Sequence, residues 1–239
     1  MRKQPSIVRI VVAAAAWLVV ALPIARAQSS DQPPVPAPPI YYAPQRVGPP
    51  AGFHQHDGFY LRLAAGLSVL HASWRETADD WSITGTGIAL VMTLGGSVTP
   101  NLVLYGEITG SMAMDPTEKH NGVSTTLDDY DVSLAGIGPG AAYYLVPANL
   151  CFSGTLAFFR LTKGYHGPSP GSEGTGGNGA ILTDTGIGAA FMVGKEWWVS
   201  TNWGLGVAGI VHLASMKLTD GDTRAVAEAL SLVLSATYN

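Results

Sequence analysis

The stretch NWGLGVAGIVHLA, which runs from Asn202 to Ala214, alternates large apolar side chains with small ones. The large residues share one parity and are Trp203, Leu205, Val207, Val211 and Leu213. The other parity is nearly bare and holds Gly204, Gly206, Ala208, Ile210 and His212. A period of two predicts a β-strand, because successive side chains of a strand point to opposite faces. Glycine weakens a strand interior, so the bare face requires an architecture that favours small residues there.

The same period recurs through the domain, without a helical pattern between the strands. It predicts eight strands, near residues 58–74, 87–95, 102–111, 127–145, 150–158, 184–194, 202–214 and 225–239. In the fourth of these, we assign Val132 and Leu134 to the face that carries the large residues. Short connections alternate with longer or more polar ones, which puts all the short ones on one side. The fold class that we predict is all-β, an eight-stranded antiparallel up-and-down barrel.

Composition decides which face of the barrel points outward. Charged residues make up 13% of the chain, against about 25% in soluble domains. A soluble barrel would bury the large residues and show the other face to water, but that face is mostly Gly, Ala, Ser and Thr. Lipid accepts an apolar face, and a closed ladder satisfies every backbone group. We therefore predict a transmembrane β-barrel with a crowded lumen; the alternative is a secreted soluble barrel that binds a hydrophobic ligand.

The N-terminal residues predict export. Arg2, Lys3 and Arg9 accompany the start of a short apolar run, and the motif Ala25-Arg26-Ala27 follows that run. The run is shorter than the roughly 20 apolar residues of a spanning helix. These features predict a cleavable signal peptide over residues 1–27.

Residues 28–55 are rich in proline and have no apolar periodicity. This composition predicts a periplasmic tether without a packed core, followed by the barrel over 56–239. The signal peptide carries four of the 13 basic residues and none of the 17 acidic ones, so the mature chain has a net charge of −8. An acidic chain is a poor partner for nucleic acid.

The signal peptide, the eight alternating strands, the short turns on one side and a final strand that closes on Tyr238 resemble the small outer-membrane barrels of the OmpA-transmembrane or OmpX type. The resemblance covers Phe59 to Tyr238 and concerns architecture. It implies a membrane protein of the cell envelope, located in the outer membrane and surrounded by outer-membrane lipids. It also implies that the barrel-insertion machinery recognises the C-terminal strand. We expect a monomer.

Polar residues on the lumen side are the first candidate site. They are Arg62, Glu107, Asp184 and His212. Charges in a narrow interior are costly unless they are paired, so we predict a polar cluster in which Arg62 pairs with Glu107. The resemblance agrees, because barrels of this type often fill their interior with salt bridges. A structural plug is the favoured interpretation, and a thin water-filled path is the alternative.

Aromatic residues near the strand ends predict two girdles at the membrane interfaces. The members that we single out are Trp74, Trp81, Trp197, Trp198, Trp203 and Tyr238.

No sequence motif indicates catalysis, cofactor binding or metal binding. His71 and Ser73 share a strand face, but no nucleophile motif accompanies them, and the acidic loop residues lack the spacing of a calcium loop. We expect no enzymatic activity, no cofactor and no metal site. The predicted function is a structural or surface-interaction role in the outer membrane, and a narrow, porin-like pore for small solutes is the alternative.

Overall fold

The computed structural model describes residues 58–76, 78–145, 148–165, 180–219 and 221–239. They all belong to one compact unit of the chain. The predicted signal peptide over 1–27 and tether over 28–55 lie outside the described residues. In the described part of the chain, no helix is long and apolar enough to cross a membrane.

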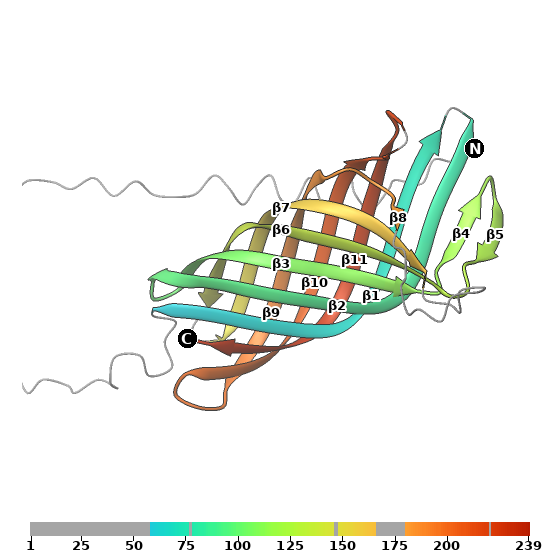
Figure 1. Ribbon diagram of the computed structural model, residues 1–239. Helices are drawn as coiled ribbons and strands as arrows, with labels where there is room; N and C mark the ends of the chain where they lie inside the picture. The colour runs from blue at the N-terminus through green and yellow to red at the C-terminus, as the bar shows by residue number, and fades with distance from the viewer. Residues whose placement is uncertain (1–57, 77, 146–147, 166–179, 220) are drawn as a thin grey trace, which may run out of the picture. The chain divides into compact units, whose positions relative to one another are not determined.

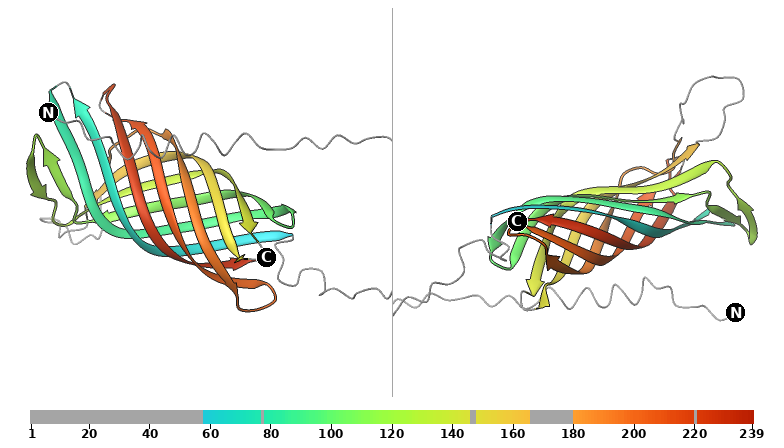
Figure 2. Two further views of the ribbon diagram at one scale, coloured as in Figure 1. Left: turned by 180° about the vertical axis from the view of Figure 1, so that it is seen from behind. Right: turned by 90° about the horizontal axis from the view of Figure 1, so that it is seen from below.

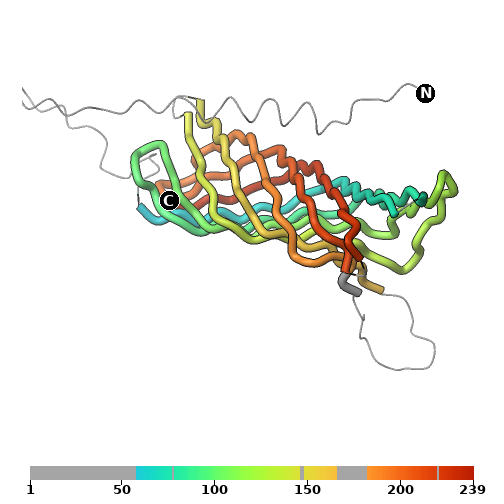
Figure 3. Tube along the Cα trace, turned by 90° about the horizontal axis from the view of Figure 1, so that it is seen from above, coloured from blue at the N-terminus to red at the C-terminus, as the bar shows by residue number. Residues whose placement is uncertain are grey.

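Eight long strands form the wall of a barrel (Figure 1). They are β1 (Phe59–Glu76), β2 (Asp79–Thr99), β3 (Leu102–Met114), β6 (Tyr130–Leu145), β7 (Leu150–Tyr165), β9 (Gly186–Trp198), β10 (Trp203–Lys217) and β11 (Arg224–Tyr238). Three short strands accompany them, namely β4 (Thr117–His120), β5 (Val123–Thr126) and β8 (Ala180–Ile181). Figure 3 shows the long strands coiling side by side around the barrel. The predicted fold class is confirmed.

The barrel closes between its first and last strands. β1 pairs antiparallel with β2 and also with β11, where Leu61 lies opposite Tyr238 and Trp74 lies opposite Ala225. Closure leaves no unpaired edge in the wall. A sheet can cross lipid only in this form, because its backbone groups find no partners in hydrocarbon.

Over most of the wall, large apolar side chains point outward and small or polar ones point inward, as the sequence predicts; large apolar side chains also fill the interior at one end. On the outside, Leu67, Leu156 and Leu234 are 73%, 72% and 69% exposed. Water would not stabilise such a band, whereas the lipid-facing surface of a membrane barrel consists of one. On the inside, alanine, serine, threonine and glycine are frequent, because eight strands enclose only enough space for side chains.

The two ends of the barrel differ (Figure 2). Short turns follow β2, β6 and β9, and the C-terminus lies at this same end. At the opposite end, residues 81–84 of β2 pair with β4 instead of β3, and β4 pairs with β5. The outer ends of β1 and β2 therefore continue beyond the barrel wall with β4 and β5, and we call this four-stranded part the extension. β2 is accordingly much longer than the predicted 87–95.

The predicted orientation of Val132 and Leu134 is wrong. Both side chains are fully buried in the interior, whereas Ile137 and Tyr143 of the same strand are exposed. The prediction assigned faces by size, but large apolar residues also fill the interior at this end. Strict alternation from Tyr143 backward gives the correct phase.

Candidate functional site: the polar interior of the barrel

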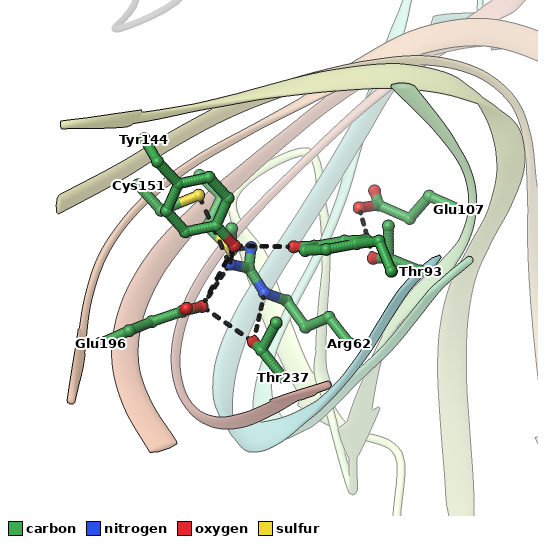
Figure 4. A network of polar contacts seen from close by, with 9 residues as sticks. Arg62, Thr93, Glu107, Tyr144, Cys151, Glu196 and Thr237 are labelled. Carbon is green, nitrogen blue, oxygen red and sulfur yellow. Dashed lines mark hydrogen bonds and ion pairs between the residues drawn. The ribbon is translucent and has the colours of Figure 1, made fainter. Parts of the chain in front are cut away.

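Arg62 is the centre of a polar network inside the barrel (Figure 4). Its side chain projects from β1 into the interior, and the residue is 3% exposed. Nη2 donates to the carboxylate of Glu196 and to Oη of Tyr144, the latter at 2.6 Å. Nε donates to Oγ1 of Thr237 at 3.2 Å. The guanidinium group therefore connects β1 with β6, β9 and β11.

Glu196 has further partners besides its ion pair. Oγ1 of Thr237 donates to Oε1 of Glu196 at 2.8 Å, and Oη of Tyr144 donates to the same oxygen at 3.5 Å. The hydroxyl groups of Tyr60 and Tyr144 lie 3.1 Å apart. The rings of these two tyrosines lie 5.6 and 5.9 Å from the guanidinium carbon of Arg62, within the range of cation–π attraction.

The ion pair crosses the lumen. β10 and β11 separate β9 from β1 in the sheet, so Arg62 and Glu196 come from strands that are not neighbours. Both residues are buried, at 3% and 5% exposure. A buried pair adds little stability over an apolar pair of the same shape, but removing one partner costs about 3–5 kcal/mol because a charge is left unpaired. The pair therefore specifies how strands on different sides of the lumen pack.

Glu107 belongs to a second polar group deeper in the barrel. It accepts a hydrogen bond from Oγ1 of Thr93 at 3.3 Å. Nearby, Tyr105 shares a hydrogen bond with Thr155 at 3.0 Å and stacks against Tyr60, with ring centroids 6.4 Å apart. The stacked tyrosines link this group to the Arg62 network, so the polar half of the interior is continuous.

His212 marks the boundary between the polar and apolar halves. Its Nε2 lies 2.7 Å from Oγ1 of Thr109, and its ring meets the ring of Phe159 edge to face at 6.1 Å. Nδ1 is buried without a hydrogen-bond partner among the described residues. The interior also contains a group of serines that are hydrogen-bonded to one another, namely Ser68, Ser111 and Ser231.

The interior toward the extension is apolar. The largest fully buried side chains of this cluster are Leu70, Ile83, Leu134, Phe159, Leu161 and Met216. We call this cluster the apolar plug. The apolar plug and the Arg62 network occupy successive parts of the interior.

The structure separates the four predicted lumen residues. Arg62, Glu107 and His212 lie inside the barrel and are buried. Asp184 is exposed, because it lies just before the start of β9. The predicted pair of Arg62 with Glu107 is wrong: the carboxylate partner of Arg62 is Glu196, and Glu107 is hydrogen-bonded to Thr93 (Figure 4).

Sequence reasoning missed Glu196 because it treated residues 196–202 as a turn. β9 continues to Trp198, which keeps Glu196 on the inward parity of Ala190 and Met192. The outward residues Val193 and Trp197 share one parity, and continuing that alternation would have placed Glu196 inside the barrel. The charged residue between them, Lys195, obscured it.

The predicted aromatic girdles have mixed outcomes in the structure. Trp197 and Trp203 are exposed on the outside at the short-turn end, where Trp203 and Tyr238 meet edge to face at 5.3 Å. Trp198 is partly buried at the same end. Trp74 is not on the outer surface, because it packs against the apolar plug from inside. Trp81, its cross-strand partner, stacks on it and on His120.

Residues suited to catalysis or metal binding are dispersed. In the described ranges, no three His, Cys, Asp or Glu side chains are grouped closely enough to hold a metal ion. His212 and Ser215 occupy opposite parities of β10, so they point to opposite faces. Among the described residues, the buried charged groups of the interior belong to the Arg62 network and to the Glu107 group, and each is hydrogen-bonded to neighbouring side chains.

No family model matches the sequence, and no curated protein matches it. Solved structures of outer-membrane proteins are similar in fold. Neisserial surface protein A is 14% identical, with 76% of this chain and 97% of that chain covered and a TM-score of 0.45. The outer membrane protein OprG from Pseudomonas aeruginosa is 10% identical, with 78% and 99% covered and a TM-score of 0.46. The outer membrane protease OmpT from Escherichia coli is 11% identical, with 77% and 97% covered and a TM-score of 0.37. The likeness of this chain to small outer-membrane barrels concerns the fold alone.

Proposed function

We propose that this chain is an integral outer-membrane protein with a closed lumen, and that it acts as a structural or surface-interaction protein. The observation that carries the proposal is the filled interior. The Arg62 network occupies one half of the lumen, and the apolar plug occupies the other half.

The outer face supports the membrane location. Apolar side chains that are more than half exposed occur on every long strand of the wall except β10, with Leu67, Leu90, Ile108, Ile137, Leu156, Ile187, Val193 and Leu230 among them. On β10, Leu205 is 49% exposed. A contiguous apolar surface of this size is rare on soluble proteins. In a membrane barrel, the short turns lie in the periplasm and the longer connections lie outside the cell.

The surface role is proposed for the extension. This part carries the outer ends of β1 and β2 beyond the barrel wall, and its outward side chains are polar, with Arg75 paired to Asp80. Under the proposed orientation, it stands outside the cell, above the lipid band. A rigid, four-stranded surface there is suited to contact with another molecule.

Electrical recording tests the closed lumen. We expect purified protein in planar bilayers to give no regular conductance steps. Replacing Arg62 by alanine together with Glu196 by alanine opens the polar half but leaves the apolar plug, so this double variant is also expected to stay closed. Regular steps from the unmodified protein would replace the proposal with a narrow pore.

Cell fractionation tests the location. We expect the protein in the outer-membrane fraction, with migration in detergent gels that changes on heating. Recovery in the soluble periplasmic fraction, without such a change, would favour the soluble barrel.

A further inference from the structure

Two grooves are lined by neighbouring residues of β1 and β2, and one of them lies nearer the extension. The first has a volume of about 680 Å³, and besides Trp74 and Trp81 its lining includes the polar residues His71, Ser73, Arg75, Asp80, Ser82 and Lys119. The second has a volume of about 880 Å³ and an apolar lining that includes Leu67, Val69, Ile88, Gly209, Leu230 and Leu232. We call them the polar groove and the apolar groove.

The strand register joins the two grooves. Val69 of the apolar groove and His71 of the polar groove are two residues apart on β1, so they share a face about 7 Å apart along the strand. Thr84 lies opposite His71 and is hydrogen-bonded to it at 2.7 Å. The linings of the apolar groove and the polar groove are therefore adjacent on β1.

The side chains that line the polar groove include two cations, Arg75 and Lys119, and one anion, Asp80. Arg75 and Asp80 form a bidentate ion pair with each other. Among the described residues, the side-chain ammonium group of Lys119 has no ion-pair or hydrogen-bond partner, although Lys119 lines the groove. Glu228 faces outward on the other side of His71, on β11, and does not line the groove. The hydroxyl groups of Ser73 and Ser82 are available beside Lys119. This set of groups suits a phosphate.

The apolar groove has room for a chain. Leu67, Leu230 and Leu232 are 73%, 62% and 61% exposed along it. Gly209 lies across β11 from β1, and a Cβ atom placed on it would meet no heavy atom within 4 Å. The absence of a side chain at Gly209 keeps this side of the groove open.

We propose that the two grooves form one binding site for a phosphorylated, acylated lipid of the leaflet at the long-connection end. Lys119, His71 and Ser73 bind the phosphate of the head group, and an acyl chain lies between Leu67 and Leu230. The site rests on the proposed membrane location, because only a protein in the bilayer meets such a lipid in this orientation.

The test is native mass spectrometry of the full-length protein in detergent micelles with three probes. Dioleoyl phosphatidic acid has the phosphate and the acyl chains, dioleoylglycerol lacks the phosphate, and glycerol 3-phosphate lacks the acyl chains. We expect phosphatidic acid to bind at least tenfold more tightly than either of the other two. Equal binding of phosphatidic acid and dioleoylglycerol would overturn the phosphate site, and equal binding of glycerol 3-phosphate would overturn the lipid.

Two matched pairs of variants locate the site. Lys119→Gln should weaken the binding of phosphatidic acid about fivefold, the effect of one exposed charge, whereas Arg160→Gln removes an exposed cation of β7 and should have no effect. Gly209→Leu fills the apolar groove and should weaken binding at least fivefold. Gly106→Leu is the control, because a Cβ at Gly106 also meets no heavy atom within 4 Å, but Gly106 lies outside the groove.

The outcomes separate this inference from the proposed function. If Lys119→Gln and Gly209→Leu bind phosphatidic acid like their controls, the lipid is only annular and the site is refuted. Heat-dependent gel migration and insertion into vesicles are measured on the same variants. Variants that insert normally and bind normally refute the lipid site alone, whereas an unmodified protein that does not insert refutes the membrane location as well.

Discussion

Replacing Arg62 by alanine removes the cation from a site where its partner cannot reach water. Glu196 is 5% exposed and would keep only the hydrogen bonds from Thr237 and Tyr144. Removing one member of a buried ion pair costs about 3–5 kcal/mol. We therefore expect Arg62→Ala to lower the free energy of unfolding by about that amount.

The double variant isolates the pair. Arg62→Ala with Glu196→Ala removes both charges of the pair and leaves neither partner unpaired, so it should be less destabilised than the sum of the single variants, by an interaction energy of about 1–3 kcal/mol. Urea unfolding of the barrel in detergent micelles, followed by tryptophan fluorescence, gives these values. Arg160→Ala removes an exposed arginine on the outer face and serves as the control. A loss below about 0.5 kcal/mol for Arg62→Ala, as at an ordinary surface position, would refute the role of Arg62 as a structural tie across the lumen.

Two further predictions concern the apolar plug and a loop. Leu134→Ala should lower the free energy of unfolding by about 2–5 kcal/mol, because Leu134 is fully buried. Ile137→Ala, on the outer face of the same strand, should lower it less. Equal losses for the two variants would contradict the observed inward and outward faces of β6. The hydrogen bond from Lys217 at 2.7 Å lowers the pKa of the Asp222 carboxyl. The small contribution of this contact to stability is therefore present above the ordinary Asp pKa, and it is lost as the pH falls through the lowered pKa. In an NMR titration, Lys217→Gln should raise the midpoint of Asp222, and an unchanged midpoint would rule out this contact.

The two-residue period was sufficient to predict the barrel, because small and large residues segregate cleanly on most strands. In β10 the parity of Trp203 and Leu205 is outward, and that of Gly204 and Gly206 is inward. This segregation has a physical origin. Lipid sets no upper limit on outward size, whereas the lumen of an eight-stranded barrel does.

Assigning large residues to the outer face was wrong where the lumen itself is apolar. The interior near the extension is filled by large residues, so Val132 and Leu134 resemble lipid-facing residues in size. Trp74 was placed in an outer girdle because it is an aromatic residue near a strand end, although it packs inward. Size alone cannot distinguish an apolar plug from an apolar exterior, and only the continuous phase of the strand does so.

The polar network was predicted in kind but not in its pairs. Arg62 and Glu107 both point inward. Which side chains they meet depends on the position of each strand around the barrel and on the stagger between strands. The pair of Arg62 with Glu196 connects strands that are 134 positions apart in the sequence. Closure of the barrel brings Arg62 and Glu196 together, and the parity of a residue in its strand does not predict which residues meet across the lumen.

The central claim is a closed barrel whose outer face meets lipid, and the stability of Leu156→Arg in lipid vesicles tests it most directly. Leu156 is 72% exposed near the middle of β7. An arginine at the midplane of a bilayer costs about 2–4 kcal/mol on the lipid face of a barrel, whereas an exposed position in water changes stability by about 0.5 kcal/mol or less. We predict a loss of about 2–4 kcal/mol relative to Leu156→Ala. No loss relative to alanine would contradict a lipid-facing wall.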